Sequence, residues 1–351
     1  MKNKLLWLPI MALFIAACGK KNQPTATHTT QTVTVTTFAG GASGVALNGL
    51  GTAASFYRPS GLAIDSSGNV YVADFFDAEI RMITPTGQVS SLIKIDGPTG
   101  VAIDPGGNIY IADYYSNLIF GSAGGAVVPI AGGGTGTATN GTAAIASFNQ
   151  PFGVAVSIPG ENLYITDYGN NMIRKTTNAF SSPVNVSTFA GSGAAGAANG
   201  AGTAASFSNP TGIAIDIAGN LYVADYGNSL IRKISPAGVV TTLAGSGQVG
   251  ATNGSGSAAS FNHPTGVAVD AAGNVYVADY GNHIIRKITA TGVVATLAGS
   301  GTVGALDGLG ADAEFDSPQG IAVDAKGQNV YVCDYGNNLI RKITITTSHN
   351  L

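Results

Sequence analysis

One segment of a long internal repeat stands at the wrong end of this chain, and its position constrains the fold more than any other feature. Residues 32–38, TVTVTTF, resemble VVTTL at 239–243 and VVATL at 293–297, which close units that began at Pro210 and Pro264. The unit that begins at Pro318 has no closing segment of this kind. A fold in which the two ends of the chain meet would supply it.

Each unit of the repeat reads as four short strands. Residues 264–299 divide into GVAVD, NVYVAD, HIIRKIT and VVATLAG, separated by turns rich in Gly and Asn. Four antiparallel strands repeated radially are typical of a propeller blade, and Gly-Asn turns favour hairpins over the alternative, a parallel solenoid. The sequence therefore predicts an all-β, six-bladed β-propeller of four-stranded antiparallel blades. A Pro-x-Gly motif opens each unit, at Pro59, Pro98, Pro151, Pro210, Pro264 and Pro318.

The displaced segment predicts how the ring closes. If residues 32–38 pair with the strand at 339–345, the N-terminal strand completes the last blade and leaves no open sheet edge there. Pro129 in VVPIAG predicts that the fourth strand lies on the outside of a blade, because only an edge strand tolerates proline.

The first residues of the chain have the pattern of a targeting signal. A positive start, a short apolar stretch and small residues before Cys18 resemble a bacterial lipoprotein signal, which implies cleavage before Cys18 and a lipid on its sulfur. An ordinary secretory signal is the alternative. We expect a signal peptide at 1–17, the lipidated Cys18 with a flexible tether at 18–31, and the propeller at 32–351. This predicts a lipid anchor in the membrane of a bacterial cell envelope, facing the periplasm or the exterior.

The repeated motifs resemble the NHL repeat. PTGVAVDAAGNVYVADYGNHIIRKI, residues 264–288, and its copies share the Pro-x-Gly, the Gly-Asn turn, the Val/Ile-Ala-Asp and the Ile-Arg-Lys, over about residues 32–345. The third unit departs from the pattern at Ser157 and Thr166, and the second has Phe120 in place of arginine. The resemblance implies a six-bladed propeller that is used mostly as a recognition surface, with enzymes in the minority.

Repeated charged residues are interpreted as structural. An aspartate ends the second strand of each unit, and an arginine follows seven residues later as its diagonal neighbour across a hairpin. Both side chains would be partly buried between stacked blades, where a charge needs a partner, so we expect a structural ion pair within each of these blades. Asp113 lacks an arginine and should be more exposed or find another donor. The expected pairs are Asp74 with Arg81, Asp167 with Arg174, Asp225 with Arg232, Asp279 with Arg286, and Asp334 with Arg341.

An aromatic residue follows each of these aspartates and gives the best candidate for a binding face. Tyrosine combines an apolar body with a polar tip, which suits a contact surface, although these rings could simply cover the blade edges. The phenylalanines of the Gly-rich inserts between units are expected to be buried. The candidate face consists of Phe75, Tyr114, Tyr168, Tyr226, Tyr280 and Tyr335.

Two classes of function remain open. The first is a non-catalytic, monomeric scaffold that binds a protein or polysaccharide of the envelope; the mildly acidic chain, of net charge −3, has no basic run that would suit nucleic acid. The second is a metal-dependent lyase or lactonase, which the four histidines do not favour. We expect no cofactor, and calcium is the single candidate. Its weak candidate ligands are Asp307, Asp312, Glu314 and Asp316.

Overall fold

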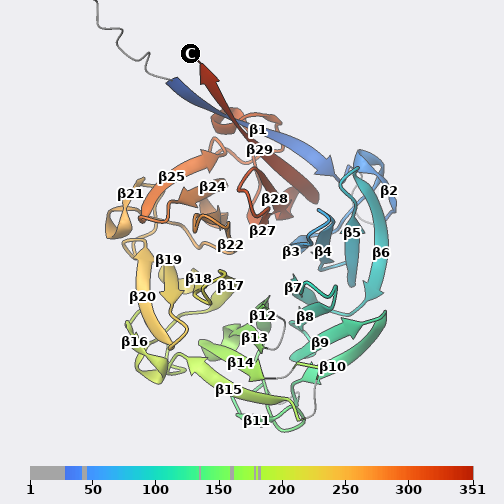
Figure 1. Ribbon diagram of the computed structural model, residues 1–351, viewed down its shortest axis with the longest axis vertical. Helices are drawn as coiled ribbons and strands as arrows, with labels where there is room; N and C mark the ends of the chain where they lie inside the picture. The colour runs from blue at the N-terminus through green and yellow to red at the C-terminus, as the bar shows by residue number, and fades with distance from the viewer. Residues whose placement is uncertain are drawn as a thin grey trace, which may run out of the picture. The chain divides into compact units, whose positions relative to one another are not determined.

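The computed structural model contains the predicted six blades. It describes residues 28–41, 46–133, 136–158, 162–177, 179–180 and 183–350. Residues Thr32–Thr346 form one compact unit, in which six antiparallel sheets are arranged in a ring (Figure 1). Outside this unit the structure describes residues 28–31 and 347–350. No helix in the described part of the chain is long and apolar enough to cross a membrane.

The first three blades follow the chain in order from the inner to the outer strand. Blade 1 contains β3 (Pro59–Ile64), β4 (Val70–Asp74), β5 (Glu79–Ile83) and β6 (Gln88–Lys94). Blade 2 contains β7 (Pro98–Ile103), β8 (Ile109–Asp113), β9 (Leu118–Ala123) and β10 (Ala126–Ala131). Blade 3 contains β12 (Pro151–Val156), β13 (Asn162–Asp167), β14 (Met172–Thr177) and β15 (Asn185–Ala190).

The last three blades repeat this order. Blade 4 contains β17 (Pro210–Ile215), β18 (Leu221–Asp225), β19 (Leu230–Ile234) and β20 (Val239–Ala244). Blade 5 contains β22 (Val267–Val269), β23 (Val275–Asp279), β24 (Ile284–Ile288) and β25 (Val293–Ala298). Blade 6 contains β27 (Pro318–Val323), β28 (Asn329–Asp334), β29 (Leu339–Asn350) and the N-terminal β1 (His28–Ala39).

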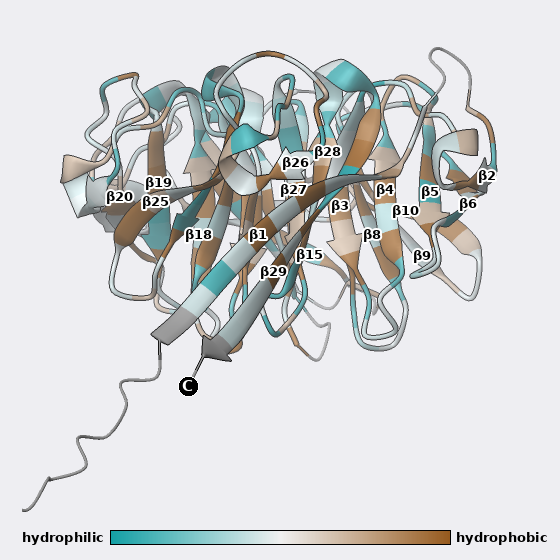
Figure 2. Cartoon of the chain, turned by 90° about the horizontal axis from the view of Figure 1, so that it is seen from above, coloured by the Kyte–Doolittle hydropathy of each residue, from teal (hydrophilic) through white to brown (hydrophobic). Residues whose placement is uncertain are grey.

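The N-terminal strand closes the ring as predicted. In blade 6 the strand order is β26-β1-β29-β28-β27, so β1 lies between the last strand of the chain and the short β26 (Gly308–Leu309). Strands β1 and β29 run side by side in both views of the chain (Figures 1 and 2). Val35 of β1 is fully buried in the core between blades 5 and 6. The blade that the sequence leaves incomplete at its C-terminal end is completed from the other end.

The Gly-rich inserts add a fifth strand to five blades, which the sequence pattern did not predict. A two-residue strand in each insert pairs with the outermost strand of the blade that follows it. Blade 2 has no insert before it and keeps four strands, so Pro129 lies on a true edge strand. In the other blades the fourth strand is covered. The added strands are β2 (Gly49–Leu50), β11 (Gly141–Thr142), β16 (Gly200–Ala201), β21 (Gly254–Ser255) and β26.

In the described part of the chain, short 3-10 helices occupy four of the inserts and the turns after the second strands of blades 3 to 6. In the inserts they are η1 (Gly51–Ala53), η3 (Gly202–Ala204), η5 (Gly256–Ala258) and η7 (Gly310–Asp312). In the turns they are η2 (Tyr168–Asn170), η4 (Tyr226–Asn228), η6 (Tyr280–Asn282) and η8 (Tyr335–Asn337).

The core lies between the blades. Hydrophobic residues are concentrated along the strands, whereas the loops at both ends are paler or hydrophilic (Figure 2). The phenylalanine of each insert is fully buried in a core cluster, as Phe56 is between blades 6 and 1. Cys333 is buried in the same cluster, and burial raises the pKa of its thiol well above the usual value. These clusters hold the six blades in register around the central axis.

Candidate binding site

Six glycines, one from each Pro-x-Gly motif, narrow the centre of the ring. A β-carbon on Gly212 would lie 2.5 Å from the carbonyl oxygen of Thr265 in the next blade, and Gly100 has the same relation to Phe152. The innermost strands can approach this closely only because glycine has no side chain. The space left between these strands has a volume of about 50 Å³. The central channel is therefore almost closed at this level.

A larger cavity opens next to this constriction and brings together all six residues of the predicted aromatic face. Its volume is about 340 Å³, within the range of about 300–1,000 Å³ that is usual for ligand pockets. The middle residues of all six Pro-x-Gly motifs also line it, together with Tyr115; they are Ser60, Thr99, Phe152, Thr211, Thr265 and Gln319. None of its lining residues is charged. We call this cavity the aromatic pocket.

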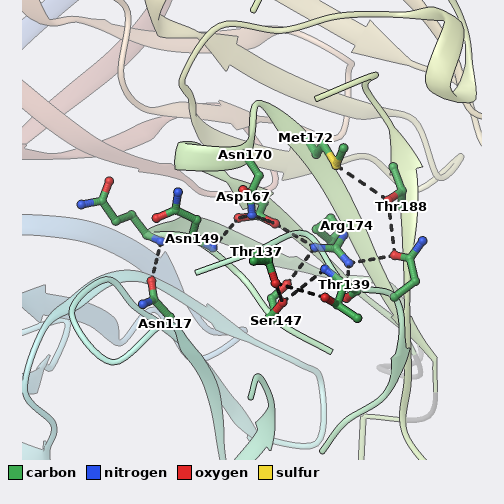
Figure 3. A network of polar contacts seen from close by, with 12 residues as sticks. Asn117, Thr137, Thr139, Ser147, Asn149, Asp167, Asn170, Met172, Arg174 and Thr188 are labelled. Atoms are coloured by element: carbon green, nitrogen blue, oxygen red, sulfur yellow. Dashed lines mark hydrogen bonds and ion pairs between the residues drawn. The ribbon is translucent and has the colours of Figure 1, made fainter. Parts of the chain in front are cut away.

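The turn after the second strand aims each tyrosine at the pocket. In blade 3, Asp167 accepts hydrogen bonds from the Asn149 backbone N–H at 2.8 Å and from the Asn170 side chain at 3.0 Å (Figure 3). Asn171, which follows, has φ of 55°, in the left-handed region that asparagine tolerates. The short η2 helix that results carries Tyr168. The same aspartate therefore fixes both the turn and the insert that meets it.

The ring tyrosines keep their hydroxyl groups available. Among the described residues, the hydroxyls of Tyr114, Tyr168, Tyr226, Tyr280 and Tyr335 form no hydrogen bond, although all of these side chains are partly buried. Burial raises the pKa of Tyr168 and Tyr226, so both stay protonated at neutral pH and can donate as well as accept. The buried Oε1 of Gln319 also has no partner within the described chain. The pocket thus offers several free hydrogen-bonding groups.

The aspartates and arginines predicted as pairs lie within ion-pairing distance in all five blades. The distances from Nη1 to Oδ2 are 2.8 to 3.1 Å, and all ten side chains are fully buried. The strand register is the predicted one, with Asp279 opposite Ile284 and Arg286 opposite Val277. Each guanidinium also lies over the buried phenylalanine of its insert, 5.2 Å from the ring centroid for Arg286 over Phe261.

A second side-chain partner of each arginine was missed by the sequence reasoning. Nη2 of Arg174 donates to Oδ1 of Asn140 at 2.8 Å and to the carbonyl oxygen of Thr139 at 2.9 Å. The asparagine before the central glycine of the insert therefore ties this loop to its blade. The sequence signal for this role was the recurrence of Asn or Asp at this position of the insert, as Asn48, Asn140, Asn199, Asn253 and Asp307.

This second role also accounts for Asp307, one of the calcium candidates. Its Oδ1 lies 2.7 Å from Nη2 of Arg341, and its Oδ2 accepts from the Thr37 backbone N–H of the N-terminal strand. Asp316 accepts from Ser317 and lies 3.8 Å from Nδ1 of His283. Within the described ranges, no group of three or more His, Cys, Asp or Glu residues is placed to hold a metal ion.

Blades 1 and 2 break the repeat at this network. Asp113, which has no arginine, stays buried and accepts hydrogen bonds from the Tyr115 and Ser116 backbone N–H groups. It therefore finds other donors and is not more exposed. In blade 1, Asp77 takes the place of the asparagine that donates to the aspartate in blades 3 to 6, and its negative charge acts on Asp74. Burial and the charge of Asp77 raise the pKa of Asp74 to about 8, against the opposing effects of the Tyr57 backbone N–H and Arg81.

The histidines of the repeats have structural contacts. Nδ1 of His283 accepts a hydrogen bond from the Ser317 backbone N–H at 3.0 Å, as Asn171 accepts from Asn209 two blades earlier. His263 lies against the ring of Tyr226, with 4.8 Å between centroids. The first-strand aspartates bind the turns that follow them; Asp270, for example, accepts hydrogen bonds from the Ala272 and Asn274 backbone N–H groups. Cys18, with the rest of the predicted signal and most of the tether, lies outside the described residues.

Comparison with known proteins agrees with this architecture. Residues 56–77, 96–121, 207–234, 261–288 and 315–343 match the NHL repeat. These segments fall in every blade except the third, where Ser157 and Thr166 depart from the pattern.

Among curated proteins, the chain is 34% identical over 152 residues to Protein SUPPRESSOR OF QUENCHING 1, chloroplastic, from Arabidopsis thaliana, and 33% identical over 157 residues to NHL repeat-containing protein 2 from Bos taurus. The matches cover 40% and 41% of this chain but only 14% and 22% of those proteins.

Solved propellers share the fold at low sequence identity. A structural genomics protein of unknown function from Bacteroides thetaiotaomicron has a TM-score of 0.74 at 22% identity, covering 90% of this chain and 77% of that one. An auxiliary nutrient binding protein from Bacteroides ovatus has a TM-score of 0.70 at 20% identity, covering 90% and 78%. At these identities the likeness shows the fold alone. The chain is a six-bladed β-propeller, and five of its blades contain a segment that matches the NHL repeat.

Proposed function

We propose that this propeller is a non-catalytic recognition module that binds a protein or polysaccharide of the bacterial cell envelope in the aromatic pocket. The observation that carries the proposal is the convergence of six aromatic side chains from six blades on one cavity, with five tyrosine hydroxyls that have no partner in the described chain. Aromatic rings with free polar tips are the side chains most often enriched where proteins bind partners. A monomer suffices, because all six blades belong to one chain.

The proposed location follows from the first residues of the sequence. Residues 1–17 act as a lipoprotein signal, Cys18 carries the lipid, and residues 18–31 tether the propeller to the membrane. Two anchoring groups are generally needed for stable membrane attachment, and a lipidated, acylated cysteine supplies them. A Cys18→Ala variant tests this: labelling with a radioactive fatty acid and sedimentation with membranes are expected for the wild type only. Equal labelling of both proteins would refute the anchor.

The pocket is tested by the double variant Tyr226→Ala/Tyr280→Ala. Immobilised wild-type protein should retain a component of solubilised bacterial envelope, and the double variant should retain at least ten-fold less. The matched control is Val293→Ala, a truncation of an exposed side chain on the outer strand β25, which should bind like the wild type. Thermal melts of all three proteins show whether the variants are folded. Equal retention by a folded double variant would place binding elsewhere.

A further inference from the structure

At blades 1 and 2 the aromatic pocket continues into a wider aromatic surface. In blades 3 to 6 the residue after the ring tyrosine is glycine, and a side chain of the insert covers it; a β-carbon on Gly169 would lie 2.5 Å from Asn149. Blade 1 has Phe76 at this position and blade 2 has Tyr115. Two neighbouring blades therefore depart from the repeat in the same way, with an aromatic residue in place of the glycine.

These two residues extend the pocket wall outward. Phe76 packs against Phe75 and Tyr57, with centroid distances of 4.9 and 5.1 Å. Tyr115 packs against Phe75 and Tyr114 at 5.2 and 5.7 Å. Their rings stay accessible, since Tyr57, Phe76 and Tyr115 are 39%, 49% and 53% exposed. We call these three residues the aromatic platform; it is continuous with the pocket through Phe75 and Tyr114.

The polar groups nearby favour a ligand rich in hydroxyl groups. The pocket presents tyrosine hydroxyls and the unpartnered Oε1 of Gln319, and it has no charged residue in its lining. The neighbouring cation, Arg58, has its guanidinium carbon 4.9 Å from the centroid of the Tyr335 ring. An uncharged site with many hydrogen-bond donors and acceptors matches a ligand that has many neutral hydroxyl groups. Its lining has no positive charge that would balance the charge of an anionic ligand.

The platform adds a second requirement. Binding is favoured when it removes the apolar surface of exposed aromatic rings from water. The ring faces of a sugar present C–H groups that can cover such surface, while its edges present hydroxyls. A cavity of about 340 Å³ is at the small end of ligand pockets. It therefore suits the end of a chain, with the following units lying on the platform.

Resting on the proposed function, we infer that the ligand is a neutral polysaccharide, bound with its terminal unit in the aromatic pocket and its next units across Tyr57, Phe76 and Tyr115. The bound polysaccharide leaves the pocket toward blades 1 and 2. A protein partner would be the other outcome of the test below.

The repeat itself supplies the test variant. Phe76→Gly/Tyr115→Gly gives blades 1 and 2 the residue that blades 3 to 6 carry at this position, so the turns keep a sequence that this fold already accepts. Val293→Ala, which truncates an exposed side chain on strand β25 of blade 5, serves as the control. Labelled proteins are applied to an array of neutral and anionic glycans of increasing length, and affinities for glycans that bind are measured by titration calorimetry.

Neutral glycans should bind the wild type and the control alike, with an affinity that rises with chain length. The glycine variant should lose at least ten-fold in affinity for glycans of several units and little for the shortest ones. Binding confined to anionic glycans, no dependence on the platform, or no glycan binding at all would overturn the inference. In the last case, retention of an envelope protein that depends on Tyr226 and Tyr280 would leave the proposed function standing, whereas its absence would remove both.

Discussion

Nη1 of Arg286 lies 2.9 Å from Oδ2 of Asp279, although both side chains are fully buried. The same guanidinium donates through Nη2 to Oδ1 of Asn253 at 2.8 Å and lies over Phe261. One arginine therefore connects the second strand, the third strand and the insert of its blade. Four other blades repeat this arrangement. The insert is therefore an integral part of each of these blades, and the arginine fixes its position.

Loss of this arginine should be costly. Arg286→Met leaves the Asp279 carboxylate buried without its cation, and removing one member of a buried pair costs about 3–5 kcal/mol. We expect a loss of that size in the free energy of unfolding, measured by urea denaturation. The double variant Asp279→Asn/Arg286→Met, which removes both charges, should lose clearly less than the single variant. If the double variant loses as much, the ion pair is not the source of the effect.

The role of β1 in closing the ring can be tested at two neighbouring residues of this strand, one buried and one exposed. Val35→Asp places a carboxylate in the core between blades 5 and 6 and should destabilise the protein by about 3 kcal/mol or more, because an unpaired buried charge is not compensated. Thr36→Asp, whose side chain is exposed, should have little effect. Thermal melting compares the two. Similar melting temperatures would mean that β1 does not close the ring in solution.

The carboxyl pair in blade 1 predicts a dependence of stability on pH. A folded pKa of about 8 for Asp74, against about 3.9 in an unfolded chain, means that the folded protein holds a proton that the unfolded chain releases. Stability should therefore fall as pH rises from about 4 to 8. Asp77→Asn replaces the second carboxyl by a donor, as in blade 5, where Asn282 donates to Asp279 at 2.8 Å. The variant should gain about 1–3 kcal/mol at pH 8 and little near pH 4.

The mirror-image variant controls for this effect. Asn282→Asp creates in blade 5 the carboxyl pair that blade 1 has, and it should introduce a loss of stability with rising pH over the same range. Urea denaturation of the three proteins at several pH values gives the curves. Parallel curves for the wild type and Asp77→Asn would show that Asp74 does not retain its proton.

A chelator should leave the propeller unchanged. Asp307 is engaged by Arg341 and Thr37, and no three-ligand metal group occurs within the described ranges. We expect no stoichiometric metal in elemental analysis and the same melting temperature with and without EDTA. Stoichiometric calcium or zinc, with a melting temperature that drops on chelation, would favour a metal-dependent enzyme and direct attention to residues 299–317.

Much of this fold could be predicted because the repeat is periodic. The spacing of Asp279 and Arg286 predicted a strand register that the structure has, and TVTVTTF predicted the closing strand. The fifth strands could not be predicted in this way, because two residues such as Gly254–Ser255 show no alternation and are held only by their partner strand. The role of Asn253 depends on a contact made 33 residues away along the chain.

The candidate site was predicted in part. The tyrosine after each aspartate marks the pocket, because that position is fixed by a turn that recurs in the sequence. The platform was missed, although Phe76 and Tyr115 visibly replace glycine, because only their three-dimensional contacts with Tyr57, Phe75 and Tyr114 show that the substitutions form one surface.

Hydroxyl-radical footprinting with mass spectrometry, in the presence and absence of solubilised envelope, measures whether partners bind in the aromatic pocket. We expect protection of Tyr168, Tyr226 and Tyr280, with no change at Ile158 and Ile217, the exposed isoleucines that line the cavities between the first-strand turns. Protection of Ile158 and Ile217 with unchanged oxidation of the tyrosines would refute binding in the aromatic pocket.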